Sequence, residues 1–340
     1  MQGILKVGIV GLGRLGQRHA ENLARHVPHA QLVAACSPLE REREWAAGTL
    51  GVARCYADYA ALLEHPGLDA VFLVTPTALH ADQIIAALRA GKHVFCEKPL
   101  SLDLQDCLRV EAEAALHPEL KVMIGFVRRF DASYRDAARK ISEGLIGKPY
   151  LIRSQTMDQN DPGGFFVRFA ASSGGIFLDC SVHDIDLVRW LLDYPTPQRV
   201  YAIGTNVIHQ GLREFDDVDN GMATLEFRDG SMASFMASRT MAHGHETLTE
   251  VFGSHGRLTI GAGARLHRVE ISDQHGMRHE CTPDFYARFS DAFLSEAREF
   301  VDAALGLGTL SLSLADATEA TRIGLAMTRA MREHRPVDFT

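Results

Sequence analysis

Hydrophobic and polar positions alternate along the first third of the chain in units typical of a parallel sheet covered by helices. Continuous apolar runs bounded by turn residues predict buried strands, and apolar residues that recur every three or four positions predict helices. The expected strands are 5–10, 31–36, 70–74, 93–96 and 121–124, with a helix over 78–90. This alternation indicates an α/β domain with a parallel sheet.

The pattern changes after residue 124. We expect a connecting segment with a helix over 125–147, a strand over 150–157, and an irregular loop over 158–175, where Gly and Pro interrupt a polar sequence. This loop is interpreted either as a lid over a pocket or as a plain surface excursion. An apolar run over 174–192 predicts a mostly buried helix.

The remaining sequence predicts a hairpin turning at Asp229 and Gly230, and an amphipathic helix over about 312–333 that packs back on the first domain. A chain of 340 residues exceeds the usual size of one hydrophobic core. We therefore expect two domains, 1–124 and 125–340.

Composition narrows the possible partners. The chain is 46% hydrophobic and 23% charged, with a formal net charge of −8 and no long run of Lys or Arg, which argues against nucleic-acid binding. No apolar run reaches the length of a membrane span, and no signal peptide is recognised at the start. Six scattered cysteines without a CxxC pair favour reduced thiols, so we expect a cytoplasmic protein with small-molecule partners.

A G-x-G-x-x-G pattern joins the first strand to the following helix. Gly11 would permit the tight turn, Gly13 would let the backbone approach a pyrophosphate, and Gly16 would let helix and strand pack closely. With Arg14 and Leu15 at the helix N-terminus, these residues form a predicted dinucleotide-binding site. A purely structural glycine turn is the weaker alternative.

Three further loops follow strand ends, where ligands of open α/β sheets bind. Ser37 stands where an acid would bind the ribose of NAD, while Arg41 or Arg43 could reach the 2′-phosphate of NADP. The other two loops carry the remaining predicted cofactor-binding residues, which are Thr75, Pro76, His80, Glu97 and Lys98. Helix capping is the alternative role for Thr75, and an ordinary solvated position is the alternative for Lys98.

Asp179, His183 and Asp186 are spaced by four and three residues in the apolar run over 174–192. On one helix they would form a single polar stripe. The spacing alone leaves two interpretations, a structural Asp–His pair with a solvated Asp186, or a catalytic stripe facing a pocket. His243 and His245 lack a convincing set of further ligands, so they are expected at the surface and no metal site is predicted.

Four motifs in order, "GIVGLGRLG", "VTPTALH", "CEKPL" and "GGIFLDCSVHDIDLVRWLL", resemble the Gfo/Idh/MocA family of nicotinamide-dependent sugar and polyol oxidoreductases. The segment 124–137 is similar to inositol 2-dehydrogenases of that family. The resemblance implies a Rossmann domain followed by an α/β domain with an open, mostly antiparallel sheet, and a homotetramer. It also implies that Lys98, Asp179 and His183 are catalytic.

The resemblance further implies oxidation of a secondary hydroxyl of a cyclic polyol or sugar, with myo- or scyllo-inositol and NAD as the expected substrate and cofactor; the local chemistry also admits NADP. His183 would act as general base supported by Asp179, and Lys98 would stabilise the developing alkoxide. Arg128, Asp158 and Asp186 would hold other hydroxyls, Asp186 by its match to a substrate contact in the family. An interdomain ion pair is the alternative role for Arg128.

Four alternatives stay open at this point. They are an aldose dehydrogenase, a glycosidase that uses NAD in a redox cycle, a dinucleotide-binding regulator without catalysis, and a metal enzyme with Asp179 and His183 as ligands. Net accumulation of NADH separates the dehydrogenases from the glycosidase and the regulator. Sensitivity to EDTA identifies the metal enzyme.

Overall fold

The computed structural model describes residues 3–263 and 265–339. The chain forms two compact units. The first contains Met1–Val127 and Asp291–Glu319, and the second contains Arg128–Ser290 and Ala320–Thr340. The predicted boundary at 124/125 lies close to residue 127, where the chain first leaves the first unit. The chain later returns to the first unit with residues 291–319.

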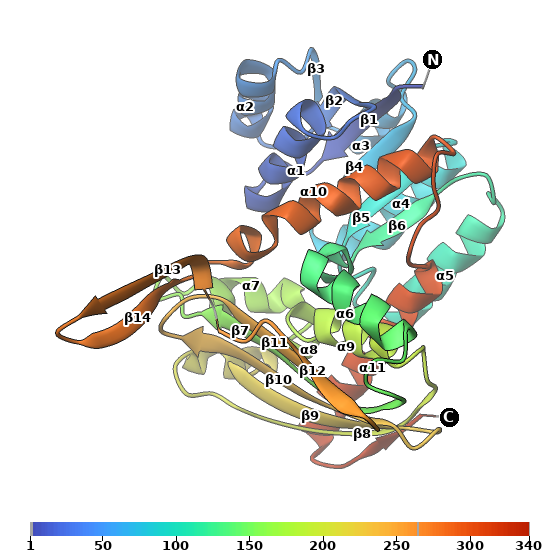
Figure 1. Ribbon diagram of the computed structural model, residues 1–340. Helices are drawn as coiled ribbons and strands as arrows, with labels where there is room; N and C mark the ends of the chain where they lie inside the picture. Colours follow the sequence, from blue (N-terminus) through green and yellow to red (C-terminus); the bar gives the residue numbers. More distant parts are fainter. Residues whose placement is uncertain (1–2, 264, 340) are drawn as a thin grey trace. The chain divides into compact units, whose positions relative to one another are not determined.

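The first unit is built on a parallel sheet, drawn blue to cyan in Figure 1, which in the described residues has six strands in the order β3-β2-β1-β4-β5-β6. This is the strand order of the Rossmann fold. Its elements are β1 (Leu5–Val10), α1 (Arg14–Arg25), β2 (Ala30–Cys36), α2 (Glu40–Leu50), β3 (Arg54–Tyr56), α3 (Tyr59–Leu63), β4 (Ala70–Leu73), a 3₁₀ turn η1 (Thr77–Leu79), α4 (His80–Arg89), β5 (His93–Glu97), α5 (Leu104–Ala115) and β6 (Val122–Gly125). The predicted strands are confirmed within a few residues.

An aromatic cluster fills one face of this sheet. Phe72 on β4 and Phe95 on β5 stack with ring centroids 4.4 Å apart, and both rings contact Phe300 on α10 (Phe285–Ala304). His19 on α1 contacts the same two strand residues. Helices α1 and α10 therefore cover this face of the sheet, and its interior is apolar and close-packed.

The second unit contains a mixed sheet of seven strands among the described residues, in the order β12-β11-β7-β10-β9-β8-β15. Only β7 and β10 pair in parallel in this part of the chain, so the expectation of an open, mostly antiparallel sheet is confirmed. Its elements are α6 (Ala132–Ser142), β7 (Pro149–Gln159), α7 (Phe165–Ser173), α8 (Ile176–Asp179), α9 (Val182–Leu191), β8 (Pro197–Thr205), η3 (Gln210–Phe215), β9 (Asn220–Phe227), β10 (Met232–Met241), β11 (Glu246–Gly253), β12 (Gly256–Ile260), β13 (Arg265–Asp273), β14 (Gly276–Cys281) and β15 (Val337–Asp338).

The chain passes from one unit to the other within three elements, of which α10 is one. The other two are η2 (Val127–Phe130) and α11 (Leu314–Glu333). Helix α11 confirms the amphipathic helix predicted over 312–333. The predicted hairpin is also confirmed, with β9 and β10 joined through Gly230 at φ 84°.

The prediction of an irregular loop over 158–175 is wrong for its second half. Residues 165–173 form helix α7. Gly164 precedes this helix and Gly174 follows it, and both have positive φ. Phe165 and Phe169 stack one turn apart on this helix. Gly164 and Gly174 flank this short helix at its two ends instead of belonging to an irregular loop.

The single helix predicted over 174–192 is divided into α8 and α9. The backbone N–H of Cys180 and that of Ser181 both donate to the carbonyl of Ile176, so the turn widens by one residue. Helix α9 then starts from Ser181, whose carbonyl accepts from the N–H of Ile185. Asp179 therefore lies on a different helix from His183 and Asp186.

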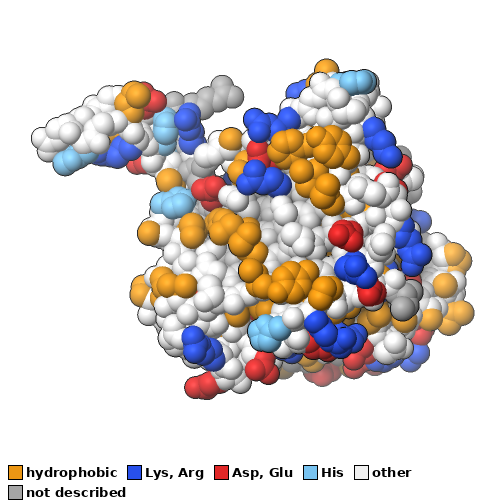
Figure 2. All heavy atoms as spheres, turned by 90° about the horizontal axis from the view of Figure 1, so that it is seen from below, with side chains coloured by type: hydrophobic (Ala, Val, Ile, Leu, Met, Phe, Trp, Pro, Cys, Tyr) orange, Lys and Arg blue, Asp and Glu red, His pale blue; other side chains and the backbone are white. Residues whose placement is uncertain are grey.

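The outer face of the second sheet exposes large apolar side chains. Tyr201 and Ile203 on β8, Met222 on β9 and Met232 on β10 are 41%, 50%, 53% and 47% exposed. Ile203 is directly opposite Met222 in the strand register. Figure 2 shows hydrophobic side chains gathered in several groups on the surface seen from below.

Strands β13 and β14 form a separate two-stranded hairpin that projects from the second unit in Figure 1. Val269 and Met277 on it are 62% and 75% exposed. None of the helices in the described part of the chain combines the length and the apolar composition that a membrane span requires.

Candidate functional site

The glycine-rich turn of the first unit has the geometry of a dinucleotide-binding loop. Gly11 has φ 88°, and a Cβ atom there would lie 2.3 Å from the carbonyl oxygen of Val74. A Cβ atom on Gly16 would lie 2.0 Å from the carbonyl oxygen of Gly11, whereas one on Gly13 would meet nothing within 4 Å. The first and third glycines are thus needed for packing, and the second leaves room for a ligand at the N-terminus of α1.

Ser37, at the end of β2, does not point a free hydroxyl outward. It is 1% exposed, and its hydroxyl donates to Oε2 of Glu42 on α2 at 2.6 Å. Arg43 donates from Nη1 to the carbonyls of Ser37 and Pro38, so this arginine holds the turn. The carboxylate of Glu42, five residues after Ser37, therefore lies at the end of β2.

The loops after β4 and β5 are joined by His80. This buried side chain lies 2.8 Å from the carbonyl oxygen of Pro99 and 2.9 Å from that of Thr75. The hydroxyl of Thr75 donates to the side chain of Gln83, and neither η1 nor α4 has a side-chain N-cap, so the capping alternative for Thr75 is wrong. The two loops therefore form one connected edge of the sheet.

Glu97 and Lys98 lie on this edge. Pro76 is exposed, Lys98 is half-buried and Glu97 is buried. The Lys98 backbone N–H donates to Oε2 of Glu97 at 3.2 Å. The predicted cofactor residues of the first unit thus lie at the carboxyl ends of β1, β2, β4 and β5, where open parallel sheets bind ligands.

A second polar group lies in the second unit around α8 and α9. Arg239 on β10 is 1% exposed, and its guanidinium donates to Asp217 at 2.8 Å and to Asp179 at 2.9 Å. His183, at the start of α9, is half-buried. Arg239 therefore fixes the carboxylate of Asp179 by a charge-assisted hydrogen bond.

Asp158, near the end of β7, joins this group through two neighbours. His245 Nδ1 lies 2.9 Å from its Oδ1, and the Cys180 thiol donates to its Oδ2 at 3.5 Å. Burial opposes ionisation of Asp158, but the hydrogen bond and charge of His245 together with Cys180 and Arg239 hold its pKa below the usual value. Asp158 is an ionised acceptor at neutral pH.

The prediction that the histidines of the HGH sequence lie at the surface is wrong for His245. His245 is 2% exposed, while the side chain of His243 is 45% exposed and pairs with Glu246. The reason is that His245 finds its partner, Asp158, on a strand distant in sequence. This burial places the His245 imidazole beside the carboxylate of Asp158.

Two buried ion pairs use the remaining predicted residues. Arg128 donates to Asp184 at 2.9 Å and to the hydroxyl of Thr156 at 2.7 Å. Arg129 donates to both oxygens of Asp186, at 2.7 and 2.6 Å. The Arg128 pair lies within the second unit, which differs from the interdomain pair considered from the sequence. These geometries favour structural roles for Arg128 and Asp186.

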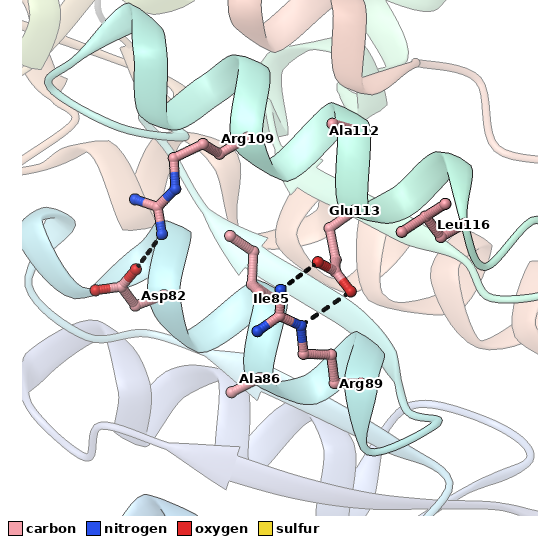
Figure 3. A pocket seen from close by; sticks show the side chains of 8 residues that line it. All are labelled: Asp82, Ile85, Ala86, Arg89, Arg109, Ala112, Glu113 and Leu116. Carbon is pink, nitrogen blue, oxygen red and sulfur yellow. Dashed lines mark hydrogen bonds and ion pairs between the residues drawn. The ribbon is translucent and has the colours of Figure 1, made fainter.

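Sequence analysis did not identify Arg239, Asp217, His245 or Glu42 as members of these groups. Arg239, Asp217 and His245 meet partners that are 22 to 87 residues away in the sequence, so local spacing carries no signal for them. Glu42 is only five residues from Ser37, but its bond to Ser37 depends on the turn between β2 and α2. A separate surface groove between α4 and α5 is lined by Asp82, Ile85, Ala86, Arg89, Arg109, Ala112, Glu113 and Leu116 (Figure 3). None of the predicted site residues lines this groove.

Two family models match the chain. The description of the first is "Oxidoreductase family, NAD-binding Rossmann fold", over residues 5–126, and the second is the GFO/IDH/MocA C-terminal domain, over 134–259. The chain is 37% identical to scyllo-inositol 2-dehydrogenase (NAD(+)) of Bacillus subtilis, over 100% of this chain and 97% of that protein. It is 33% identical to myo-inositol 2-dehydrogenase of Thermotoga maritima, over 98% of each.

Solved structures give the same relationship. A structure of scyllo-inositol dehydrogenase from Lactobacillus casei with bound NAD(H) and scyllo-inositol has a TM-score of 0.95 and 39% identity, over 98% of this chain and 99% of that one. The structure of myo-inositol 2-dehydrogenase from Lactobacillus plantarum has a TM-score of 0.96 and 35% identity, over 99% of this chain and 100% of that one.

Proposed function

Because the chain belongs to the GFO/IDH/MocA family of oxidoreductases, we propose that it is an NAD-dependent inositol 2-dehydrogenase. The observation that carries this proposal is similarity over the full length to proteins named scyllo- and myo-inositol 2-dehydrogenases. The similarity includes a structure that holds both NAD(H) and scyllo-inositol. An aldose dehydrogenase of the same family is the second candidate, and no feature of the site favours it.

The first unit fits a nicotinamide dinucleotide. Gly11, Gly13, Arg14, Leu15 and Gly16 form the turn and helix N-terminus that would hold the pyrophosphate. The bound cofactor supplies the hydride acceptor. The edge formed by Thr75, Pro76, His80, Glu97 and Lys98 would contact its nicotinamide half.

Glu42 supports the choice of NAD over NADP. Its carboxylate accepts the Ser37 hydroxyl at the end of β2, where the ribose of the cofactor binds in this fold. A negative charge at this position repels a 2′-phosphate and accepts hydrogen bonds from ribose hydroxyls. Ser37 acts by orienting this carboxylate.

We assign the chemistry to Lys98, Asp179 and His183. His183 accepts the hydroxyl proton as general base, and Asp179, itself held by Arg239, supports the imidazolium that forms. The ammonium of Lys98 donates a hydrogen bond to the reacting oxygen and stabilises its negative charge as hydride leaves carbon. These roles rest on the motif resemblance.

Asp158 is the strongest candidate for a contact with the other hydroxyls of the polyol. It is ionised, its side chain is 27% exposed, and His245 fixes its orientation. A carboxylate accepts two hydroxyl hydrogens from a cyclic polyol. Arg128 and Asp186 support the surrounding elements through their ion pairs.

We further propose that the protein is a homotetramer in the cytoplasm. The exposed apolar side chains on β8, β9 and β10 form a face typical of a subunit interface. An isolated two-stranded hairpin such as β13–β14 is marginally stable, so a neighbouring subunit is its expected support. The free cysteines fit a reducing compartment.

The test is turnover of scyllo- and myo-inositol with NAD⁺, with the product identified by mass spectrometry. Net NADH and a ketone two hydrogens lighter than the substrate are expected. A glycosidase that recycles its NAD would release sugar without net NADH, and a non-catalytic regulator would bind NAD without turnover. Either result would overturn the proposal, as would turnover restricted to aldoses.

A further inference from the structure

Three ionisable side chains meet in the interior of the first unit. They are His19 on α1, Glu97 at the end of β5 and Glu296 on α10, with exposed fractions of 1%, 6% and 0%. One nitrogen or oxygen atom of each lies within 4.8 Å of the others. His19 Nε2 and Glu97 Oε1 are 2.7 Å apart, whereas neither oxygen of Glu296 has a hydrogen-bond partner in the described part of the chain.

The surroundings of this cluster are apolar. The rings of Phe72, Phe95 and Phe293 have their centroids 6.0, 5.4 and 5.5 Å from that of His19. In such surroundings two neighbouring carboxylates cannot both be ionised without a large cost. Burial, followed by the charges of Glu97 and Glu299, raises the pKa of Glu296 well above its usual value.

Glu97 connects the cluster to the loop that carries Lys98. Its Oε1 faces His19 Nε2, and its Oε2 accepts the backbone N–H of Lys98. A Cβ atom on Gly125 of β6 would lie 3.0 Å from Cζ of Phe95 and 3.4 Å from Oε1 of Glu97, so this glycine packs directly against the ring and the carboxylate. Glu97 therefore connects the cluster directly to the backbone that carries the Lys98 side chain.

We propose that His19, Glu97 and Glu296 form a positioning cluster for Lys98, in which Glu296 is a neutral carboxylic acid and each oxygen of Glu97 accepts one hydrogen bond. A neutral Glu296 does not repel the Glu97 carboxylate. Glu97 therefore keeps its hydrogen bonds to His19 and to the backbone N–H of Lys98. His19 carries a hydrogen on Nε2 and donates it to Glu97. The positioning role rests on the proposed function because it requires catalysis by Lys98, but the protonation of Glu296 does not.

The distance between His19 and Glu97 argues against a metal ion bound between these two side chains. Two ligands of a tetrahedral zinc ion lie about 3.3 Å apart, given metal–ligand distances of about 2.0–2.1 Å. The separation of 2.7 Å between His19 Nε2 and Glu97 Oε1 is that of a direct hydrogen bond. A hydrogen bond from His19 to Glu97 fits this geometry.

Infrared spectroscopy tests the protonation state independently of activity. At neutral pH the wild-type protein should show the C=O stretching band of a buried carboxylic acid, which moves to lower frequency in D₂O. Glu296→Gln should remove this band, and Glu299→Gln, on the same helix, should leave it. Absence of the band, its persistence in Glu296→Gln, or a stoichiometric divalent metal bound by the wild type and lost in Glu296→Gln would overturn the proposal.

Kinetics test the positioning role. His19→Gln and Glu97→Gln should lower kcat about 10- to 100-fold, the cost of a displaced catalytic group, with KM for inositol nearly unchanged. Neither substitution should lower kcat further when added to Lys98→Met, because both act through Lys98. His93→Gln is the matched control, since it removes a histidine that accepts the Lys121 N–H at the other end of β5.

The outcomes separate the two proposals. If Lys98→Met retains full kcat, the proposed role of Lys98 fails, and the infrared result decides on Glu296 alone. If Lys98→Met lowers kcat but His19→Gln and Glu97→Gln do not, or if their losses add to that of Lys98→Met, positioning through Lys98 is refuted. Circular dichroism of each purified variant confirms that the kinetics are those of folded protein.

Discussion

Both carboxylate oxygens of Asp186 accept hydrogen bonds from the guanidinium of Arg129, and each side chain is 1% exposed. A third donor of Arg129 reaches the hydroxyl of Tyr194 at 2.9 Å. The pair therefore ties η2 to α9, the helix that carries His183. The motif resemblance matches Asp186 to a substrate contact of the family, whereas in this structure both of its carboxylate oxygens accept from Arg129.

Loss of one partner of this pair should destabilise the protein strongly. Arg129→Met removes the guanidinium that donates to both oxygens of the buried Asp186 carboxylate, and breaking such a pair costs about 3–5 kcal/mol. The free energy of unfolding by urea measures this effect. Arg199→Met, which breaks the exposed pair with Asp338, is the matched control and should change stability little. Equal effects of the two substitutions would show that the buried pair has no special role.

The Asp158–His245 pair predicts a pH dependence of stability. Because the folded-state pKa of Asp158 is lowered, its stabilising contribution is present above the ordinary aspartate pKa and is lost as the pH falls through the folded value. Asp158→Asn should therefore lower stability at neutral pH, and its difference from wild type should shrink in acid. Thermal unfolding across the acid range measures this difference. A constant difference at all pH values would contradict the assigned ionisation of Asp158.

Glu42 should set the preference for NAD. Glu42→Gln removes a hydrogen-bonding charge that contributes about 1.5 kcal/mol, so the ratio of kcat/KM for NAD⁺ to that for NADP⁺ should fall about tenfold. Glu44→Gln, two residues later on the exposed side of α2, is the control. An unchanged ratio in Glu42→Gln would mean that this carboxylate does not face the ribose.

His183 should be required for turnover. Removal of a general base lowers kcat by about 10²- to 10⁴-fold, so His183→Ala should lose activity to this extent while its affinity for NAD⁺ is retained. His117→Ala, a partly exposed histidine of the first unit, should keep normal kinetics. Fluorescence titration with NADH measures the affinity. A loss below about tenfold would remove His183 from the role of base.

The strands of the first unit and the glycine-rich turn could be predicted because their signals are local. Buried parallel strands appear as continuous apolar runs, and Gly11 and Gly16 are required by contacts of the turn itself. The position of His245 could not be predicted, because its partner Asp158 is 87 residues away. The same holds for Arg129 and Asp186, 57 residues apart. Local spacing predicts which face a residue shares, but not what packs against that face.

Helix α7 and the division between α8 and α9 show a second limit. Glycine is common both in loops and at the ends of helices. The sequence therefore does not reveal that Gly164 and Gly174 flank a helix. The widened turn at Ser181 depends on a single extra residue between carbonyl and N–H. Such differences arise from backbone hydrogen bonds, which the pattern of side chains does not encode.

Hydride transfer from a deuterated substrate tests the central claim most directly. The protein is incubated with NAD⁺ and scyllo-inositol that carries deuterium on its ring carbons, and the reduced cofactor is analysed by mass spectrometry. The account predicts net NADH that contains one deuterium, together with a ketone product, and neither in His183→Ala above a trace. Absence of label from the reduced cofactor, or absence of net reduction with every inositol tested, would contradict it.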